Sequence, residues 1–318
     1  MTGTITVLVT AIGSFASDAV VTALQSRANT RVIGCDIYPG NWHAVTGKYN
    51  AFYQVPLVTR TEAYLEKIES ICKEEAIDFI FPLTDVEVDV FNVNRSVFQK
   101  LGVVLCIPGP GALAVARNKM ALAAFVVNKT DFPAIQTYGL NTVLPDLPFP
   151  LIAKPLDGRS SEGIVWVYDK YGLDAIQNKE NYLLQEVIRG PIYTVDYVRS
   201  HSLNIDFSIP RKELLRTKNG AGMTVEIFEN QELSQMVSTI GRALKINGCV
   251  NMEFIERDKQ YYLIDINPRF SAGVAFSKLA GYDMVNSHMN AFLDEAILPA
   301  VRVKKSIAIK HMIDLLNG

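Results

Sequence analysis

The chain has 318 residues, a formal net charge of −2 and a pI near 6.1, and 49% of its residues are hydrophobic. This length corresponds to about two domains of ~150 residues, and the composition excludes a wholly disordered or collagen-like chain. The near-neutral charge excludes the strongly basic surface that binds nucleic acids and the polybasic patch that binds anionic membranes.

Strand-like and helix-like patterns alternate through the first part of the chain. Short apolar, β-branched runs predict strands at 5–10, 31–37, 79–83 and 103–107. Helical periodicity predicts helices between them at 14–26, 63–75 and 86–101. Strands separated by helices form βαβ units with a parallel sheet. We therefore expect an α/β, Rossmann-like domain over residues 1–112, which ends at the Pro/Gly turn 108–111.

The rest of the chain, residues 113–318, is rich in consecutive strands. They are expected at 151–154, 164–168, 183–186, 193–199, 203–209, 250–256 and 261–266, with an amphipathic helix at 231–244. Strands that follow strands tend to pair antiparallel, so we expect an α+β domain. The four cysteines form no CxxC pair and are expected to be buried free thiols. This pattern, with no basic segment before the first apolar run, favours a reduced, cytoplasmic compartment.

The strongest local cluster lies at 251–270. Glu253 and Asp265 are 12 positions apart with a turn between them, so a hairpin can bring both carboxylates to one side. Asn267 and Arg269 follow at two-residue steps and share the face of Asp265. Carboxylate and amide oxygens suit a Mg²⁺ ion that bridges phosphate oxygens. The alternative, a solvated hairpin, is less favoured because the flanking residues are apolar and unpaired buried charges are costly.

A second cluster spans 151–167. Lys154 ends a strand, and the following glycine- and serine-containing turn at 158–163 could hold phosphate oxygens through its backbone N–H groups. It is not a Walker A motif, because Ile164 and Val165 follow the second glycine instead of Lys and Ser or Thr. Without further support, such a loop is more often an ordinary hairpin turn.

The turn after the first strand is a third candidate. Gly13 stands where a dinucleotide-binding turn would stand, and Asp36 follows 23 residues later, near the ~20 expected of a ribose-binding acid. The GxGxxG pattern is absent, so a structural role for Gly13 is favoured. A nicotinamide-dependent oxidoreductase remains an alternative. His288 lies on an expected helix and is predicted to be packed or on the surface, not catalytic.

Taken in order, these motifs resemble the ATP-grasp superfamily, in particular the branch of the carbamoyl-phosphate synthase large subunit and biotin carboxylase. The motifs are RNK at 117–119, IAKP at 152–155, DGRSSEG at 157–163, LLQEVIRG at 183–190, NMEF at 251–254 and LIDINPR at 263–269. The resemblance implies that the Rossmann-like domain precedes an ATP-grasp domain. That domain would have a lid at about 120–187 and a metal-bearing body at about 188–318.

The resemblance also implies residue roles. The cofactor-binding residues would be Lys119 and Lys154 on the ATP phosphates, Ser160, Ser161 and Gly163 in the lid loop, and Glu186, Val187 and Ile188 at the adenine hinge. The ligands of Mg²⁺ (or Mn²⁺) would be Glu253, Asp265 and Asn267. The catalytic cations would be Arg269 and Lys154.

The resemblance implies that the protein is an ATP-dependent carboxylate–amine ligase that acts on small molecules. No nucleic-acid or membrane partner is expected, and a homodimer is compatible with the resemblance. Ile192 stands where the family usually has a ribose-binding glutamate, and Ala272 where carbamoyl-phosphate synthases have a second arginine. A nucleotide-binding protein that does not turn over is therefore a further alternative. Substrate contacts are expected from 12–15, from 84–87 and from 210–222, where Arg211 and Arg216 would bind a carboxylate, join the phosphate site or lie in a solvated loop.

Overall fold

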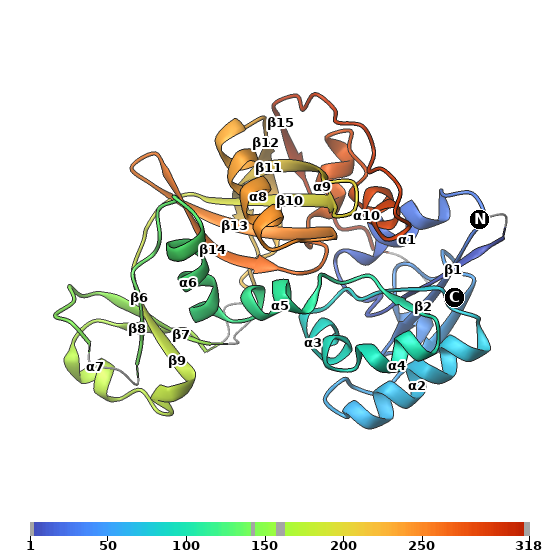
Figure 1. Cartoon of the computed structure of the whole chain (residues 1–318), viewed down its shortest axis with the longest axis horizontal. Coiled ribbons are helices and arrows are strands. Elements are labelled where there is room, and N and C mark those ends of the chain that lie inside the picture. Colours follow the sequence, from blue (N-terminus) through green and yellow to red (C-terminus); the bar gives the residue numbers. More distant parts are fainter. Residues whose placement is uncertain (1–2, 141–143, 157–162, 315–318) are drawn as a thin grey trace.

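A computed structural model describes residues 3–140, 144–156 and 163–314. The described residues form three sheets, which Figure 1 shows as a first unit at one end, a small unit at the other end, and a large unit between and above them. The first sheet is parallel and the other two are antiparallel, so the expected α/β unit followed by an α+β unit is confirmed.

The first sheet has the strand order β3-β2-β1-β4-β5. Its strands are β1 (Ile5–Val9), β2 (Thr30–Asp36), β3 (Ala51–Gln54), β4 (Phe79–Phe81) and β5 (Val104–Leu105). The helices around it are α1 (Ser17–Gln25), α2 (Thr61–Glu74), α3 (Asp85–Val93) and α4 (Arg95–Lys100). The single helix predicted at 86–101 is wrong, because the chain leaves the α-helical region at Asn94, whose side-chain amide donates to the carbonyl of Val90. Strand β3 has no counterpart among the predicted strands, because its four residues are too few to show a distinctive pattern.

The strand order changes direction between β1 and β4, since β1 continues to β2 on one side and β4 continues to β5 on the other. In an open parallel sheet, ligands bind outside the carboxyl ends of the strands at such a switch point. The segments that leave these two ends are 10–16 after β1 and 82–86 after β4.

The largest sheet has the order β14-β13-β10-β11-β12-β15. Its strands are β10 (Ile192–Ser200), β11 (Ile205–Arg216), β12 (Gly222–Ile227), β13 (Gly248–Arg257), β14 (Gln260–Asn267) and β15 (Ser306–Ile309). Helices α8 (Gln231–Ala243) and α10 (Met284–Phe292) cover opposite faces, because Tyr197 packs in the cluster that contains α8 residues and its neighbour Val198 in the cluster that contains α10 residues. The short helix α9 (Val274–Leu279) precedes α10.

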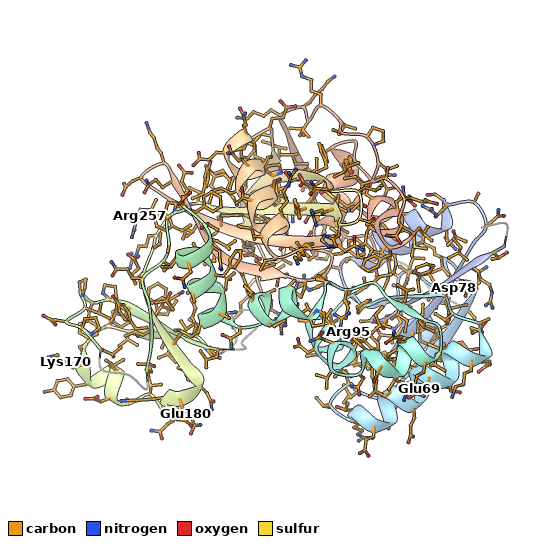
Figure 2. All side chains as sticks on the ribbon, viewed as in Figure 1. Glu69, Asp78, Arg95, Lys170, Glu180 and Arg257 are labelled. Carbon is orange, nitrogen blue, oxygen red and sulfur yellow. The ribbon has the colours of Figure 1, made fainter. Side chains whose placement is uncertain are left out.

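The small sheet has the order β6-β9-β7-β8. It consists of β6 (Thr137–Gly139), β7 (Leu151–Pro155), β8 (Val165–Val167) and β9 (Tyr182–Glu186), with the short helix α7 (Lys170–Asp174) beside it. The residues Lys170 and Glu180, labelled in Figure 2, lie at the outer end of this small lobe, away from the large sheet. A separate apolar cluster that includes Leu151, Ala153 and Leu184 fills its interior.

Helices α5 (Pro110–Ala116) and α6 (Lys119–Lys129) connect the units and pack with the large sheet, since Ala112, Leu122 and Phe125 share a cluster with residues of β10, β13 and α8. Residues of α6 therefore pack with the large sheet, whereas residues of β7 and β9 form the cluster of the small sheet. The first unit and the large unit also share one core, in which α1 packs against α10.

Four buried free cysteines are present, as predicted. His288 is 3% exposed and packs among Phe81, Phe270 and Phe292. Burial lowers its pKa to about 3, so it is a neutral core residue, which agrees with the prediction of a packed, non-catalytic side chain. Among the described residues, no single helix is long and apolar enough to cross a membrane; only the pair α5 and α6, bent by 103°, reaches that length and composition together.

Candidate functional site

The β13–β14 hairpin brings the predicted carboxylates together. Its turn uses Asp258 and Lys259 at φ values of 54° and 63°, the left-handed conformation of a tight hairpin turn. Glu253 pairs directly with Asp265, which confirms the predicted register. A register irregularity follows Glu253, where Phe254 pairs with Leu263 and leaves Ile264 without a partner. A bulge re-aims side chains, which explains why the consecutive residues Ile264 and Asp265 line the same pocket.

Each carboxylate has a cationic neighbour. The Nζ atom of Lys119 is 3.6 Å from Asp265 Oδ2, and Nη2 of Arg216 is 2.9 Å from Glu253 Oε2. Burial, reinforced by the charge of Asp265, raises the pKa of Glu253 above its ordinary value although Arg216 opposes the shift. Two adjacent, partly desolvated carboxylates form a site that a divalent cation would stabilise.

The side-chain oxygens present fit a Mg²⁺ ion that takes its remaining ligands from water and substrate phosphates. Among the described residues, no group of three or more His, Cys, Asp or Glu side chains could hold a metal ion. The oxygen donors of Glu253, Asp265 and Asn267 therefore provide two carboxylates and one amide. Mg²⁺ is commonly held by one or two carboxylates, waters and substrate phosphates, so this set fits an ion that arrives with a nucleotide.

A first pocket, which we call the inter-lobe pocket, lies between the small sheet and the hairpin and has a volume of about 260 Å³. It contains seven of the predicted site residues, namely Lys119, Lys154, Glu186, Val187, Ile188, Glu253 and Asp265. Its apolar walls are Ile135, Ile152, Trp166, Ile255 and Ile264. These apolar side chains form one part of the pocket, which we call the apolar slot, and the pocket also contains the two lysines Lys119 and Lys154.

The two lysines lie close enough to interact. Lys119 begins α6, and its backbone N–H donates to the carbonyl of Leu156 at 3.1 Å, which ties this helix to the end of β7. Burial, together with the charge of Lys119, lowers the pKa of Lys154 to about 8, against a smaller opposing effect of Asp265. A phosphate group placed between two lysines would relieve that repulsion.

The role that the family resemblance implies for Lys154, binding of the ATP phosphates, leads together with its pKa to a predicted pH dependence. Lys154 is charged below about pH 8 and neutral above it, so kcat/KM for ATP should fall as the pH rises through that value. The Lys154→Arg variant stays charged throughout this range and should lose this limb of the profile. The measurement is phosphate release at limiting ATP as a function of pH. A profile that is identical in both proteins would contradict the assignment.

The hinge residues Glu186, Val187 and Ile188 line the pocket. Glu186 uses its side chain elsewhere, because Oε2 pairs with Arg257 at 2.8 Å and Oε1 accepts from the N–H of Gln136 at 3.1 Å. A Cβ at Gly190 would lie 1.8 Å from the carbonyl oxygen of Glu256, so only glycine fits where this segment crosses the hairpin. Ile192, the residue at the usual ribose-binding position, packs near Ile255 and does not line the pocket.

The predicted lid loop is described only at its end. Gly163 has a φ of +70°, and a Cβ there would lie 2.8 Å from Pro155, so the exit from the loop requires glycine. Ser160 and Ser161 lie outside the described residues, and their proposed phosphate contacts stay predictions.

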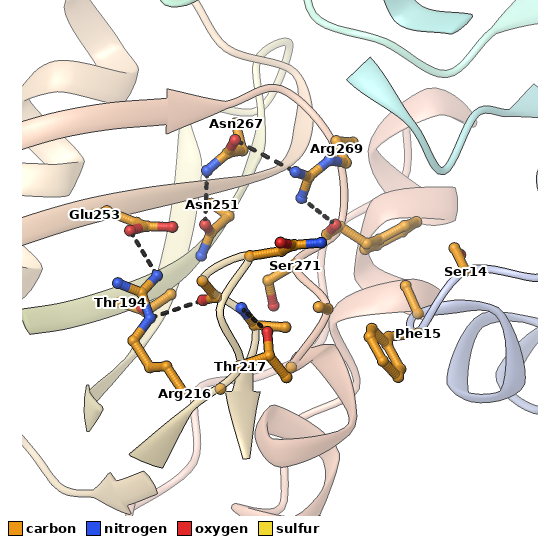
Figure 3. Close-up of a pocket in the computed structure, with 18 of the residues that line it drawn as sticks. Ser14, Phe15, Thr194, Arg216, Thr217, Asn251, Glu253, Asn267, Arg269 and Ser271 are labelled. Atoms are coloured by element: carbon orange, nitrogen blue, oxygen red, sulfur yellow. Dashed lines mark hydrogen bonds and ion pairs between the residues drawn. The ribbon is translucent and has the colours of Figure 1, made fainter. Parts of the chain in front are cut away.

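A second pocket, which we call the central pocket, has a volume of about 710 Å³ and lies between the large sheet and the first unit (Figure 3). Arg269 and Asn267 line it together with Asp85 from the start of α3. The Nη2 atom of Arg269 is 3.0 Å from Asp85 Oδ2 and 3.4 Å from Asn267 Oδ1. The central and inter-lobe pockets share Arg216, Glu253 and Asp265, so these residues form the wall between them.

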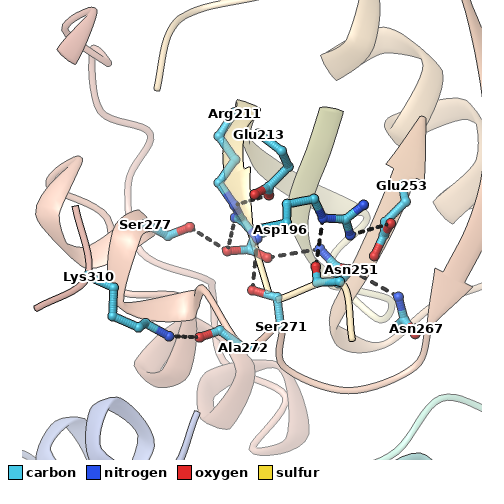
Figure 4. A network of polar contacts seen from close by, with 12 residues as sticks. Asp196, Arg211, Glu213, Asn251, Glu253, Asn267, Ser271, Ala272, Ser277 and Lys310 are labelled. Carbon is cyan, nitrogen blue, oxygen red and sulfur yellow. Dashed lines mark hydrogen bonds and ion pairs between the residues drawn. The ribbon is translucent and has the colours of Figure 1, made fainter. Parts of the chain in front are cut away.

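Arg211, whose role the sequence left open, is a buried residue that also lines the central pocket. It lies on β11 with its side chain 2% exposed, so the solvated-loop alternative is wrong for it. As Figure 4 shows, Nη1 donates to Asp196 at 2.8 Å and Nη2 to Ser271 at 3.1 Å. Asp196 also accepts from Ser277 and, at 3.3 Å, from Asn251. The network positions Asn251, whose Oδ1 atom accepts a hydrogen bond from Nδ2 of Asn267 at 3.2 Å.

Sequence reasoning missed several residues of these pockets. Trp166 and Ile135 form the wall of the inter-lobe pocket, but a half-exposed aromatic in a short strand carries no distinctive signal. Asn251 belongs to the quoted motif NMEF, and its two-residue step before Glu253 could have placed it on the same face. The pair Asp85–Arg269 joins residues 184 positions apart, which no local pattern can predict.

Comparisons with known proteins agree with this arrangement. Residues 178–315 match the family described as "ATP-grasp in the biosynthetic pathway with Ter operon". Residues 7–106 match the family described as "PylC-like, N-terminal domain".

Three similar proteins indicate how far the likeness extends. A D-alanine–D-alanine ligase of Petrotoga mobilis is 22% identical over 70% of this chain and 82% of its own length. A carbamoyl phosphate synthase large chain of Clostridium beijerinckii is 26% identical over 44% of this chain but only 14% of its own length. The biotin carboxylase domain dimer of Hydrogenobacter thermophilus 2-oxoglutarate carboxylase, solved with MgADP, ADP and bicarbonate, superimposes with a TM-score of 0.74 at 15% identity, over 95% of this chain and 73% of that one.

Proposed function

Because this chain joins a PylC-like N-terminal domain to an ATP-grasp domain, we propose that it is an ATP- and Mg²⁺-dependent carboxylate–amine ligase. A carboxylate oxygen attacks the γ-phosphorus of ATP and releases ADP. An amine then attacks the carbonyl carbon of the resulting acyl phosphate, releases inorganic phosphate and leaves an amide. The substrates are small molecules, as they are for the named relatives.

The observation that carries this proposal is the shared wall of two pockets. Glu253 and Asp265 face both the inter-lobe pocket, which contains Lys119 and Lys154, and the central pocket, which contains Arg269. A nucleotide whose adenine lies in the apolar slot directs its phosphates toward this wall. A carboxylate in the central pocket approaches the same point from the other side, which provides the proximity that phosphoryl transfer requires.

The chain's own residues position and neutralise charge. A Mg²⁺ ion held by Glu253, Asp265 and Asn267 would supply charge neutralisation on the transferring phosphoryl group. Lys119 and Lys154 hold phosphate oxygens on the side of the inter-lobe pocket. Arg269 donates to developing negative charge from the central pocket, and its pairing with Asp85 fixes the direction of the guanidinium.

Asp36, the residue that supported the nicotinamide alternative, has a structural role in its turn. The carboxylate that would bind a ribose already accepts the N–H of Gly13 at 2.9 Å and the N–H of Tyr38 at 3.1 Å. Both oxygens therefore stabilise the turn itself, which agrees with the structural role favoured for Gly13.

The proposal is tested by phosphate release from ATP and Mg²⁺ across a panel of carboxylate and amine pairs, with mass spectrometry of the products. We expect at least one pair to release phosphate well above the rate with either partner omitted, and to yield the amide. ATP binding without such release for any pair would favour the non-catalytic nucleotide-binding alternative instead. Gel filtration of the same protein tests the expected homodimer, and fractionation of cells tests the expected cytoplasmic location.

A further inference from the structure

A third pocket, which we call the N-terminal pocket, lies wholly within the first unit and takes no part in the proposed phosphoryl transfer. Its volume of about 680 Å³ is within the range of ~300–1,000 Å³ typical of small-molecule sites. It is lined by residues that follow β1, β2 and β4, including Gly13, Ile37 and Thr84. It therefore occupies the carboxyl ends of the parallel strands at the switch point, where such folds bind ligands.

The walls of this pocket are mainly hydrocarbon and aromatic. Val55, Leu57, Val58 and Val86 provide aliphatic surface. Trp42 lines the pocket and is 70% exposed, with its ring stacked on Tyr38 at 5.8 Å between centroids. An exposed tryptophan at the edge of an apolar cavity provides a large rigid contact surface that water covers poorly, and a hydrophobic ligand would cover it.

The charged side chains that line the N-terminal pocket are acidic. Asp36 and Glu87 line it, with His43 beside Asp36, and no lysine or arginine does so among the described residues. Glu87 is held in place by Tyr64, whose hydroxyl donates at 2.9 Å, and by Thr84, whose hydroxyl donates at 2.7 Å. A phosphate or carboxylate would meet no lysine or arginine of the described residues here, whereas a cationic group would be attracted by the acidic side chains and a neutral group would not be repelled.

The N-terminal pocket continues into the central pocket. Ser14, Thr84 and Val86 line both cavities, so one molecule could occupy the two together. The Ser14 hydroxyl at this junction is buried and has no hydrogen-bond partner among the described residues. An unpaired buried hydroxyl costs free energy, which a polar group of a ligand passing the junction would recover.

From these observations we propose that the N-terminal pocket binds the hydrophobic, preferably aromatic, side chain of the amine substrate. This inference rests on the proposed ligase function only in that the bound amine is called a substrate. The preference of the pocket for a hydrophobic amine does not depend on the ligase function. The amine partner is assigned here because the cations that suit a carboxylate, Arg269 and Arg216, lie in the central pocket. The amine nitrogen would lie near the junction, with its side chain between Trp42 and Val86.

The two tryptophans of the chain provide a direct test, because Trp42 lines the N-terminal pocket and Trp166 the inter-lobe pocket. In the Trp166→Phe variant, all tryptophan emission comes from Trp42. Titration of this variant with phenethylamine, without ATP, should change the emission saturably. Ethylamine, which lacks the ring, and 3-phenylpropionate, which replaces the amine by a carboxylate, should bind at least ~10-fold more weakly. In the converse variant, Trp42→Phe, emission should respond to MgATP and not to phenethylamine.

Activity provides the second arm. Trp42→Ala should raise KM for aromatic amines about 10-fold while KM for ATP and for ethylamine stays unchanged. Tyr171→Ala, which removes a ring that is 87% exposed on α7, is the matched control and should change neither. No response of Trp42 to phenethylamine, or equal affinity for 3-phenylpropionate, would overturn the assignment while leaving the ligase proposal intact. A Trp42 response without phosphate release for any amine would uphold the pocket and refute the ligase.

Discussion

Replacing Asp265 by asparagine is expected to lower Mg²⁺-dependent phosphate release at least ~100-fold, which corresponds to about 2.7 kcal/mol of transition-state stabilisation. Asp265 lies opposite Glu253 on the hairpin and lines both pockets that meet at the proposed transfer point. The variant keeps the size of the side chain and removes only its charge. The Mg²⁺ concentration at half-maximal rate should rise in parallel.

Binding of ATP in the absence of metal distinguishes loss of the metal site from unfolding of the protein, because an unfolded protein would not bind ATP. Asp265 lies 3.6 Å from Lys119, and its negative charge repels phosphate when no metal is present. Asp265→Asn should therefore bind ATP in the presence of a chelator at least as tightly as the parent protein does. Asp258→Asn is the matched control, since it makes the same change in the exposed turn of the same hairpin and should leave the rate unchanged. Full activity of Asp265→Asn would refute the metal assignment.

Arg269→Ala is expected to lower kcat on the order of 10²–10³-fold while KM for ATP changes little. Arg269 lines the central pocket and is absent from the lining of the inter-lobe pocket, so it should act on the reacting groups and not on nucleotide capture. The measurement is a steady-state series in ATP and in the carboxylate at saturating amine.

The stability of the Arg269→Ala variant has to be measured separately, because Asp85 is 6% exposed and loses a partner at 3.0 Å. Arg117, whose Nη1 atom lies 3.9 Å from Asp85 Oδ1, should still neutralise part of the charge of this carboxylate. Arg269→Lys retains the charge but not the fork of donors and should give an intermediate rate. Arg242→Ala breaks an exposed pair with Asp206 and should leave kcat unchanged. A rise in KM for ATP with unchanged kcat would instead place Arg269 in nucleotide binding.

The sequence by itself determined the features that depend on near neighbours. The alternation of β-branched runs and amphipathic helices predicted the parallel sheet, although the break at Asn94 and the four-residue strand β3 carried too little local pattern. The step of 12 between Glu253 and Asp265 and the two-residue step to Asn267 predicted one polar face, because a strand's side-chain period and a tight turn fix the register.

Only the tertiary structure decided which of these groups are buried, paired or open to a ligand. Arg211 and Arg216 look alike along the chain and both line the central pocket. Arg211, however, is buried and paired with Asp196, whereas Arg216 also lines the inter-lobe pocket. Only the fold shows that each oxygen of Asp36 accepts a backbone N–H group, from Gly13 and from Tyr38. Ion pairs, shared cores and cavities join residues up to 268 positions apart, so they exist only once the chain has folded.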